Sequence, residues 1–430
     1  MTILLKNGKK SDNTNLDLLI SNGIIKKLNP NSVSADKIIN LNGKFILPGI
    51  IDPHVHMRDM NQSYKEDWTS GTNSALRGGI TTVMDMPNTI PPTINNENLA
   101  IKREFAKKSK VNYGFNLGYI GTNSADIREV KKFNAIKVFL CESSGGVPVE
   151  DPKQLTNVFK IAEELQVPLI FHSESGSCIQ ECTAQFEPII NNHHLIRNRK
   201  CAIKTTKVVI EMSYKYNCKV YFAHVATAEE MDLICEAKKI NKNIFCEITP
   251  HHLLITRKKL EQVGNWGRVN PPLRDFEDNQ RILKAILEGT VDTIGTDHAP
   301  HNLDEKNKSY SNAPSGFPGF ETCLPLLLNE VNSGNLSLEL VEKITSYNSS
   351  NIFNIKNRGK IKEGYFADIT VIDLEKEFIV NPGLFQTKAK YSPFINMKLK
   401  GDVFMTIVNG EIAYKDEKYN NTKGIEIDYR

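Results

Sequence analysis

The alternation of hydrophobic and polar residues divides the chain into three parts. At its start, short apolar segments are separated by polar turns, among them the Asn22-Gly23 and Asn42-Gly43 pairs that favour β-hairpins. In the middle, short apolar runs alternate with amphipathic stretches of helical length, which is the rhythm of βα units around a parallel sheet. Near residue 359 the β pattern returns, around an Asn409-Gly410 turn.

The middle part contains the runs that we interpret as the strands of a barrel. They lie at about residues 49–54, 80–86, 112–119, 135–140, 167–172, 219–224, 243–248 and 291–296. Eight such runs predict an α/β protein with a closed (β/α)8 TIM-type barrel over residues 49–358. The two termini, residues 1–48 and 359–430, are predicted to form one small β domain, and the polar stretch 302–316 a mobile loop.

Composition and charge exclude several classes of protein. The chain has 430 residues, of which 40% are hydrophobic, and 54 Lys and Arg against 50 Asp and Glu give a net charge of +4. This balance lacks the basic excess of a nucleic-acid-binding protein. No apolar run reaches the ~18 residues of a membrane span, and no secretory signal is expected. The eight cysteines contain no C-x-x-C pair, which argues against a disulfide scaffold and favours a cytoplasmic location.

Histidines gather at the ends of the predicted strands. His54 and His56 end the first run, His172 the fifth and His224 the sixth, while His251 follows the seventh. A single histidine at a strand end is more often a hydrogen-bonded structural residue than a ligand. Because the carboxyl ends of barrel strands meet on one rim, five histidines there favour a metal centre.

Two further residues complete the predicted cluster. Lys137 lies within the fourth run, and since a closed barrel has no edge, its side chain must point to the helices or into the lumen. Beside histidines and dications the amine would lose its proton, and a neutral lysine can add carbon dioxide to become a bidentate carbamate ligand. Asp297 follows the eighth run, where a carboxylate can both bind a metal and transfer a proton. The alternative is that Asp297 caps a following helix, and Pro300, only three residues later, argues against it.

These residue types together predict metal-assisted hydrolysis. Two cations that share a hydroxide can polarise a carbonyl group and stabilise a tetrahedral oxyanion. Histidine and carboxylate ligands suit zinc, and manganese or cobalt could occupy the same positions. His193 and His194 stand among Asn, Arg and Lys residues, which predicts a solvated surface for both.

Several longer motifs carry a family resemblance. They are Asp52-Pro53-His54-Val55-His56-Met57-Arg58, Lys65-Glu66-Asp67, residues 78–93 with Pro87-Asn88-Thr89, Thr249-Pro250-His251-His252-Leu253, Asn270-Pro271-Pro272-Leu273-Arg274 and Thr296-Asp297-His298-Ala299-Pro300-His301. Nearly end to end, the chain resembles the dihydroorotases, a branch of the cyclic amidohydrolases. The Pro-Asn-Thr, Asn-Pro-Pro-Leu-Arg and Ala-Pro-His elements together favour dihydroorotase over hydantoinase or allantoinase.

The resemblance implies a reaction and a set of site residues. The reaction is the interconversion of (S)-dihydroorotate and N-carbamoyl-L-aspartate in pyrimidine biosynthesis, by a hydroxide that bridges two zinc ions. The implied ligands are His54, His56 and Asp297 for one zinc, His172 and His224 for the other, and carboxylated Lys137 between them, with Asp297 also catalytic. Arg58, Asn88 and His301 would bind the substrate carboxylate, and Asn270 would lie near its ring.

The chain departs from the family pattern at two places. Relatives often carry Arg-Glu-Pro-Gly where this chain has Arg58-Asp59-Met60-Asn61, which affects the loop and spares the ligands. Some bacterial relatives use an aspartate as the bridging residue, and Glu142 lies near Lys137 in sequence as the acidic alternative.

Two rival interpretations stay open. One is a hydantoinase or allantoinase, with the same metals and a different ring. The other is an inactive scaffold for aspartate transcarbamoylase, against which the presence of all six expected ligands argues. The family also implies a homo-oligomer, most simply a dimer, that can associate with aspartate transcarbamoylase.

Overall fold

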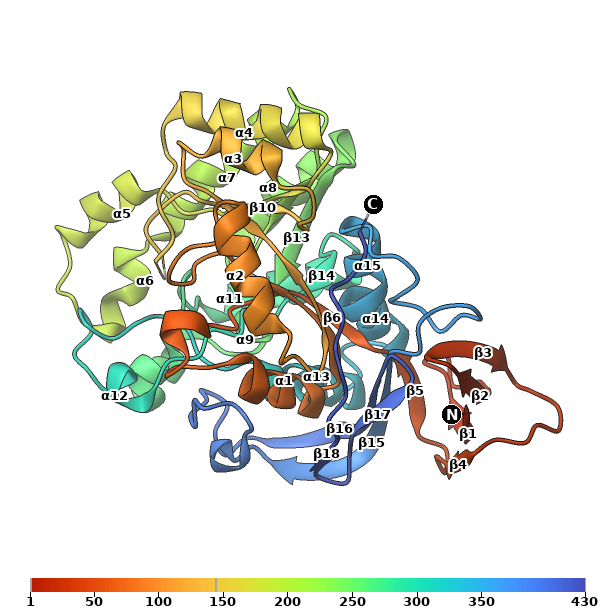
Figure 1. Ribbon diagram of the computed structural model, residues 1–430. Helices are drawn as coiled ribbons and strands as arrows, with labels where there is room; N and C mark the ends of the chain where they lie inside the picture. Colours follow the sequence, from red (N-terminus) through yellow and green to blue (C-terminus); the bar gives the residue numbers. More distant parts are fainter. Residues whose placement is uncertain (1, 144, 430) are drawn as a thin grey trace.

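The structure is a computed structural model that describes residues 2–143 and 145–429. A barrel ringed by helices forms its larger part, and a sheet built from both ends of the chain lies against the outside of this barrel (Figure 1). Among the described residues, no helix combines the length and the apolar character that crossing a membrane requires.

All eight predicted barrel runs contain strands. The strands are β6 (Ile50–Val55), β7 (Ile80–Asp85), β8 (Asn112–Phe115), β9 (Leu117–Tyr119), β10 (Ile136–Phe139), β11 (Leu169–His172), β12 (Val220–Phe222), β13 (Ile244–Ile248) and β14 (Thr293–Ile294). The third run is divided into β8 and β9 at Asn116, whose N–H donates to the carbonyl of Asp85 on β7.

Two parallel sheets close into the barrel. One has the order β6-β7-β8 and the other β14-β13-β12-β11-β10-β9. The chain itself joins them at β8 and β9, and on the opposite side Val55 of β6 pairs in parallel with His298, just beyond β14. The prediction of a (β/α)8 barrel is therefore confirmed.

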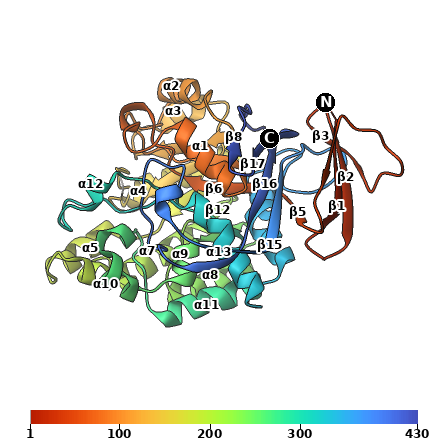
Figure 2. The same cartoon turned by 90° about the horizontal axis from the view of Figure 1, so that it is seen from below.

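Helices cover the outside of the barrel (Figure 2). They are α1 (Trp68–Arg77), α2 (Asn96–Ala106), α3 (Ser124–Glu129), α4 (Pro152–Leu165), α5 (Gly176–Thr183), α6 (His193–Ile196), α7 (Arg199–Ser213), α8 (Ala228–Ile240), α9 (Pro250–Leu254), α10 (Leu260–Val263), α11 (Phe276–Leu287), α12 (Leu303–Lys306), α13 (Phe320–Asn332), α14 (Leu338–Glu342) and α15 (Asn348–Ile352). Helix α4 shows why they form: Asp151 caps its first turn, Pro152 fits the first helical position, and Leu155, Val158 and Ala162 place an apolar stripe toward the strands.

The barrel interior changes character along its axis. Side chains two residues apart on a strand point the same way, so Ile170 and His172 share the lumen, as do Ala135 and Lys137. At the lower end Ile170 packs in an apolar cluster that includes Phe353, just beyond α15. The lower layer of the barrel is therefore apolar, and the polar side chains lie in the upper layer, at the carboxyl ends of the strands.

The two termini share one sheet, as predicted. Its strands are β1 (Thr2–Lys9), β2 (Asn15–Ser21), β3 (Ile24–Leu28), β4 (Lys37–Asn40), β5 (Phe45–Pro48), β15 (Ile369–Ile379), β16 (Lys398–Val408), β17 (Glu411–Lys415) and β18 (Lys418–Tyr419). The order is β18-β17-β16-β15-β5-β1-β2-β3, with β4 beside β1, so β5 and β15 join the two ends of the chain. The small β domain is confirmed, while its exact bounds, 1–48 and 359–430, stay a prediction.

The surface prediction for His193 is wrong. Its side chain is buried, and its ring contacts the Tyr310 hydroxyl at 2.8 Å through Nδ1 and the Val269 carbonyl at 2.8 Å through Nε2. The polar residues beside His193 in sequence indicated an exposed side chain. The ring is buried because it contacts Val269, which follows α10, and Tyr310, which follows α12. His194 is partly exposed.

Candidate active site

Two histidines from β6 and the loop after it converge on the aspartate that follows β14. Nε2 of His56 lies 3.1 Å from Oδ1 of Asp297, and Nε2 of His54 lies 3.5 Å from the same oxygen. The side chains are buried or nearly so, with Asp297 the most open at 11% exposure. The backbone of Asp297 is left-handed, with φ 47°, a conformation that is uncommon for residues other than glycine.

The hydrogen bonds of these rings place a proton on each Nδ1. Nδ1 of His54 contacts a carboxylate oxygen of Glu247 at 2.8 Å, and Nδ1 of His56 contacts the amide oxygen of Asn88 at 2.8 Å. These oxygens accept hydrogen bonds and cannot donate them, so each Nδ1 holds the proton. Burial lowers the pKa of His56 to about 4, which keeps its ring neutral at pH 7. The lone pair on Nε2 of His56 therefore faces the Asp297 carboxylate, and a cation between them resolves the repulsion.

A second pair of histidines lies across the lumen. Nδ1 of His172, at the end of β11, is 3.1 Å from Nε2 of His224, which follows β12. Nε2 of His172 contacts Glu174 at 2.9 Å, so its proton is on the outer nitrogen and a lone pair points inward. Burial lowers the pKa of His172 to about 4 and that of His224 well below its usual value. Neutral rings of this kind are metal ligands.

Lys137 lies between the two pairs. Its side chain is fully buried, and among the described residues its Nζ has no hydrogen-bond partner. The amine lies over the ring of Phe139, 4.9 Å from its centroid. Burial lowers the pKa of Lys137 to about 8, which makes the neutral amine accessible near physiological pH. The amine is thus chemically able to form the predicted carbamate.

These six residues line one cavity. Its remaining lining includes Asn270, whose amide nitrogen donates to Ser143 at 3.3 Å and whose amide oxygen accepts from Ser315 at 3.1 Å. Arg58, Asn88 and His301 lie next to this cavity and are absent from its described lining; Asn88 lines a neighbouring one. Glu142 is exposed and lines an outer hollow, so Lys137 is the residue that shares the cavity with the four histidines.

Arg58 and His301 form a pair of donors. Nη2 of Arg58 is 3.1 Å from Nε2 of His301, while Nδ1 of His301 contacts the Lys65 ammonium at 3.0 Å. An ammonium has only hydrogens to offer, so Nδ1 accepts and Nε2 carries the proton, which it donates to the Ser315 carbonyl at 3.1 Å. Two donors cannot bond to each other, so the Nη2 group of Arg58 is left to donate to a carboxylate. Among the described residues no acidic side chain forms an ion pair with the buried Arg58.

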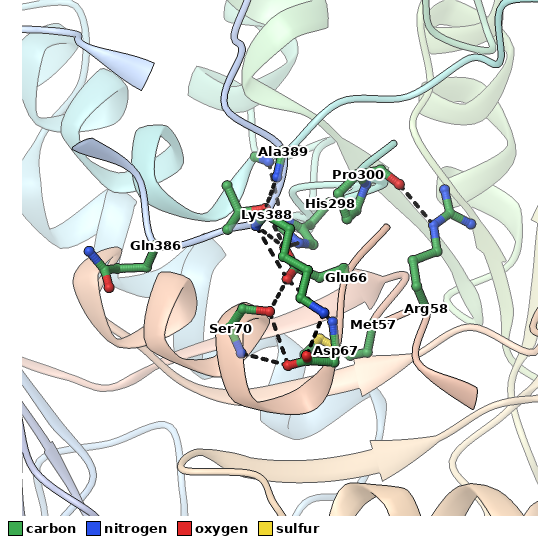
Figure 3. Close-up of polar contacts among 12 residues, drawn as sticks. Met57, Arg58, Glu66, Asp67, Ser70, His298, Pro300, Gln386, Lys388 and Ala389 are labelled. Carbon is green, nitrogen blue, oxygen red and sulfur yellow. Dashed lines mark hydrogen bonds and ion pairs between the residues drawn. The ribbon is translucent and has the colours of Figure 1, made fainter. Parts of the chain in front are cut away.

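The Lys65-Glu66-Asp67 motif anchors the loop that presents Arg58. Arg58, Asp59 and Met60 are all left-handed, with φ between 46° and 57°. Figure 3 shows Glu66 between Ser70 and the backbone at Lys388, with Arg58 donating to the carbonyl of Pro300. Asp67 caps α1 and pairs with Lys388 at 2.6 Å. The strained loop is held by contacts from the far end of the chain.

Sequence reasoning missed the residues that orient the ligands. Glu247 accepts from the His54 ring, from the His224 N–H at 3.0 Å and from the Tyr221 hydroxyl at 2.8 Å. Glu174 holds His172 and pairs with Arg197 at 2.7 Å. The available signals were an acidic residue inside an apolar run, for Glu247, and one two positions beyond a strand-end histidine, for Glu174.

Comparisons with known proteins agree with this geometry. The amidohydrolase family matches residues 45–413. A dihydroorotase of Methanosphaera stadtmanae is 38% identical over 96% of both chains, and a dihydroorotase of Carboxydothermus hydrogenoformans is 35% identical over 96% of this chain and 98% of its own. An L-hydantoinase (dihydropyrimidinase) from Arthrobacter aurescens superimposes with a TM-score of 0.95 at 27% identity, covering 99% of each chain. The chain belongs to the amidohydrolase family and, within it, to the dihydroorotases.

Proposed function

We propose that this protein interconverts (S)-dihydroorotate and N-carbamoyl-L-aspartate at a dinuclear metal centre. The observation that carries the proposal is the buried guanidinium of Arg58, which lies beside the histidine cluster and forms no ion pair with an acidic side chain of the described residues. Such a group suits a ring with an anionic substituent, which dihydroorotate has and hydantoin lacks. The dihydroorotase relatives support the same substrate.

The donor set fits two divalent metals. His54, His56 and Asp297 would hold one, His172 and His224 the other, and carboxylated Lys137 would bridge them. We assign zinc to both sites because nitrogen and carboxylate ligands suit it. Bound metals would supply Lewis acidity and lower the pKa of water near the substrate amide. Glu247 and Glu174 hold the rings in the tautomers that ligation requires.

The remaining chemistry belongs to Asp297 and the cavity walls. Asp297 accepts a proton from the attacking water during hydrolysis and delivers it to the departing ring nitrogen; in cyclisation it works in reverse. Asn270, held by Ser143 and Ser315, presents its amide to the ring.

Substrate preference tests the proposal directly. We expect dihydroorotate to be opened at least ~30-fold more efficiently than dihydrouracil, hydantoin or allantoin. Arg58→Met should shrink this preference mainly by slowing dihydroorotate, because the carboxylate interaction of a buried guanidinium is worth ~2–4 kcal/mol, a factor of about 30 to 1000. Ring opening of all four compounds gives the readout, with the exposed Arg128→Met as the matched control. Faster opening of hydantoin or allantoin by the wild type would refute the proposed substrate.

Lys65 should act on binding through His301. Lys65→Met removes the donor to Nδ1, so the ring proton can move to that nitrogen, and the ring then loses the Nε2–H bond to the Ser315 carbonyl that holds it beside Arg58. We expect KM for dihydroorotate to rise about tenfold, the value of one charged hydrogen bond of ~1.5 kcal/mol, with kcat nearly unchanged. Steady-state kinetics of Lys65→Met, Lys65→Arg and the exposed control Lys160→Met measure this. Equal KM values in Lys65→Met and the control would contradict the role.

Three wider features follow from the family resemblance and belong to the proposal. The protein acts in the cytoplasm, works as a homodimer and can associate with aspartate transcarbamoylase. A hydantoinase-like activity is the second candidate, and it is favoured by the fold similarity to the L-hydantoinase.

A further inference from the structure

Three cysteines meet between α5 and α7, outside the cavity of the candidate active site. The sulfur atoms of Cys178, Cys182 and Cys201 all lie within 4.8 Å of one another, and Cys178 and Cys201 are joined as a disulfide. The three side chains are 0–4% exposed and form a small cluster of their own against Ile179. Cys178 and Cys201 have a sequence separation of 23, so no short spacing motif indicates that they lie together.

Two of the three cysteines lie in the first turns of helices. Cys178 and Cys201 are each the third residue of a helix, α5 and α7, so two helix N-termini converge on the cluster. Cys182 is one helical turn beyond Cys178 and lies on the same face of α5. The positive end of a helix dipole stabilises a thiolate in the first turn. A disulfide needs two sulfurs, and the third remains directly beside it.

We propose that the reduced Cys178, Cys182 and Cys201 form a three-thiolate site for a soft, thiophilic cation. Soft sulfur ligands select Cu(I), zinc and related ions over the harder ones, and three thiolates suit the trigonal geometry that Cu(I) and Cd²⁺ accept. No His, Asp or Glu of the described residues joins this group of ligand atoms. The site is therefore chemically distinct from the histidine and carboxylate ligands at the barrel rim.

Disulfide and metal exclude each other at this site. A dithiol reductant transfers two electrons and two protons to the Cys178–Cys201 bond and becomes a disulfide itself, which leaves three thiols. On metal binding these thiols release their protons to solvent, and the cation compensates the buried negative charge.

The cluster is also connected to the second histidine pair. The N–H of Ser175 donates to the carbonyl of Cys201 at 3.1 Å, and Ser175 follows Glu174, which holds His172. Arg197, the partner of Glu174, lies four residues before Cys201. Cys141 groups with His172 and Glu174 and must be controlled for.

Cadmium binding tests the proposal on the full chain. The protein is loaded with zinc, reduced with a phosphine and titrated with Cd²⁺, while the ultraviolet charge-transfer band of cadmium thiolate is recorded. Imidazole and carboxylate ligands do not produce this band, so the active site is silent. We expect one saturable binding event in the reduced wild type and its loss after oxidation of the same sample. Cys182→Ser should lose most of the band, whereas Cys141→Ser and the buried control Cys218→Ser should keep it.

Three outcomes would overturn the inference. They are no band in the reduced wild type, an equal band in Cys182→Ser, or loss of the band in Cys141→Ser instead. The comparison of reduced and oxidised wild type needs no substitution, so a folding defect in a variant leaves the test decisive. Because the readout is independent of turnover, its result is separate from that of the substrate assays.

Discussion

Lys137→Ala is expected to lose the second metal and most of the turnover. The wild type should hold about two metals per chain, because its six ligands are more than a single tetrahedral site of roughly four can use. The amine is the buried group that lies between the two histidine pairs. Without a carbamate, His172 and His224 alone leave a divalent ion undercoordinated. Elemental analysis after purification without chelators and an assay of dihydroorotate opening give the two readouts.

Chemical rescue separates a lost ligand from a damaged fold. Acetate or propionate should restore part of the activity of Lys137→Ala by replacing the carbamate oxygens, whereas Lys137→Arg should not recover because a guanidinium cannot become an anionic ligand. Lys219→Ala is the matched control, since its Nζ donates to the Ile352 carbonyl at the apolar end of the barrel. Full activity of Lys137→Ala, or one metal in zinc- and bicarbonate-treated wild type, would refute the dinuclear centre.

Asp297→Asn is expected to lower turnover by ~10²-fold or more because the amide cannot accept and deliver the proton. Metal affinity should also fall, since one carboxylate ligand of the first site is lost, but His54 and His56 remain to form a recognisable site. Stopped assays in both directions together with metal titration measure the two effects. Asp292→Asn is a suitable control, because this carboxylate pairs with Lys238 at 2.6 Å just before β14.

The same residue predicts opposite pH dependences for the two directions. Hydrolysis should speed up as pH rises, because the attacking water must give up a proton to Asp297, whereas cyclisation should speed up as pH falls, because it consumes a proton that Asp297 delivers. In Asp297→Asn both dependences should flatten. Parallel pH profiles for the two directions of the wild type would exclude Asp297 as the proton carrier.

The sequence by itself determined the architecture and the chemical types at the rim. Short apolar runs between amphipathic stretches specify βα units, and eight of them close because each parallel strand needs two neighbours. The residue at the end of each run can be predicted from the neighbouring sequence, and the geometry of the barrel brings these strand ends together on one rim. His54, His172 and Asp297 lie 118 to 243 positions apart in the sequence, and they could still be grouped because each stands at or just after the end of a strand.

Only the tertiary structure decided which partners complete each group. Glu247 orients His54 from 193 residues away, and Lys65 fixes the tautomer of His301 from 236 residues away. His193 became a core residue through Val269 and Tyr310, and Cys201 met Cys178 through the approach of two helices. Burial and hydrogen-bond partners depend on how separate elements pack, and no periodicity along the chain encodes that packing.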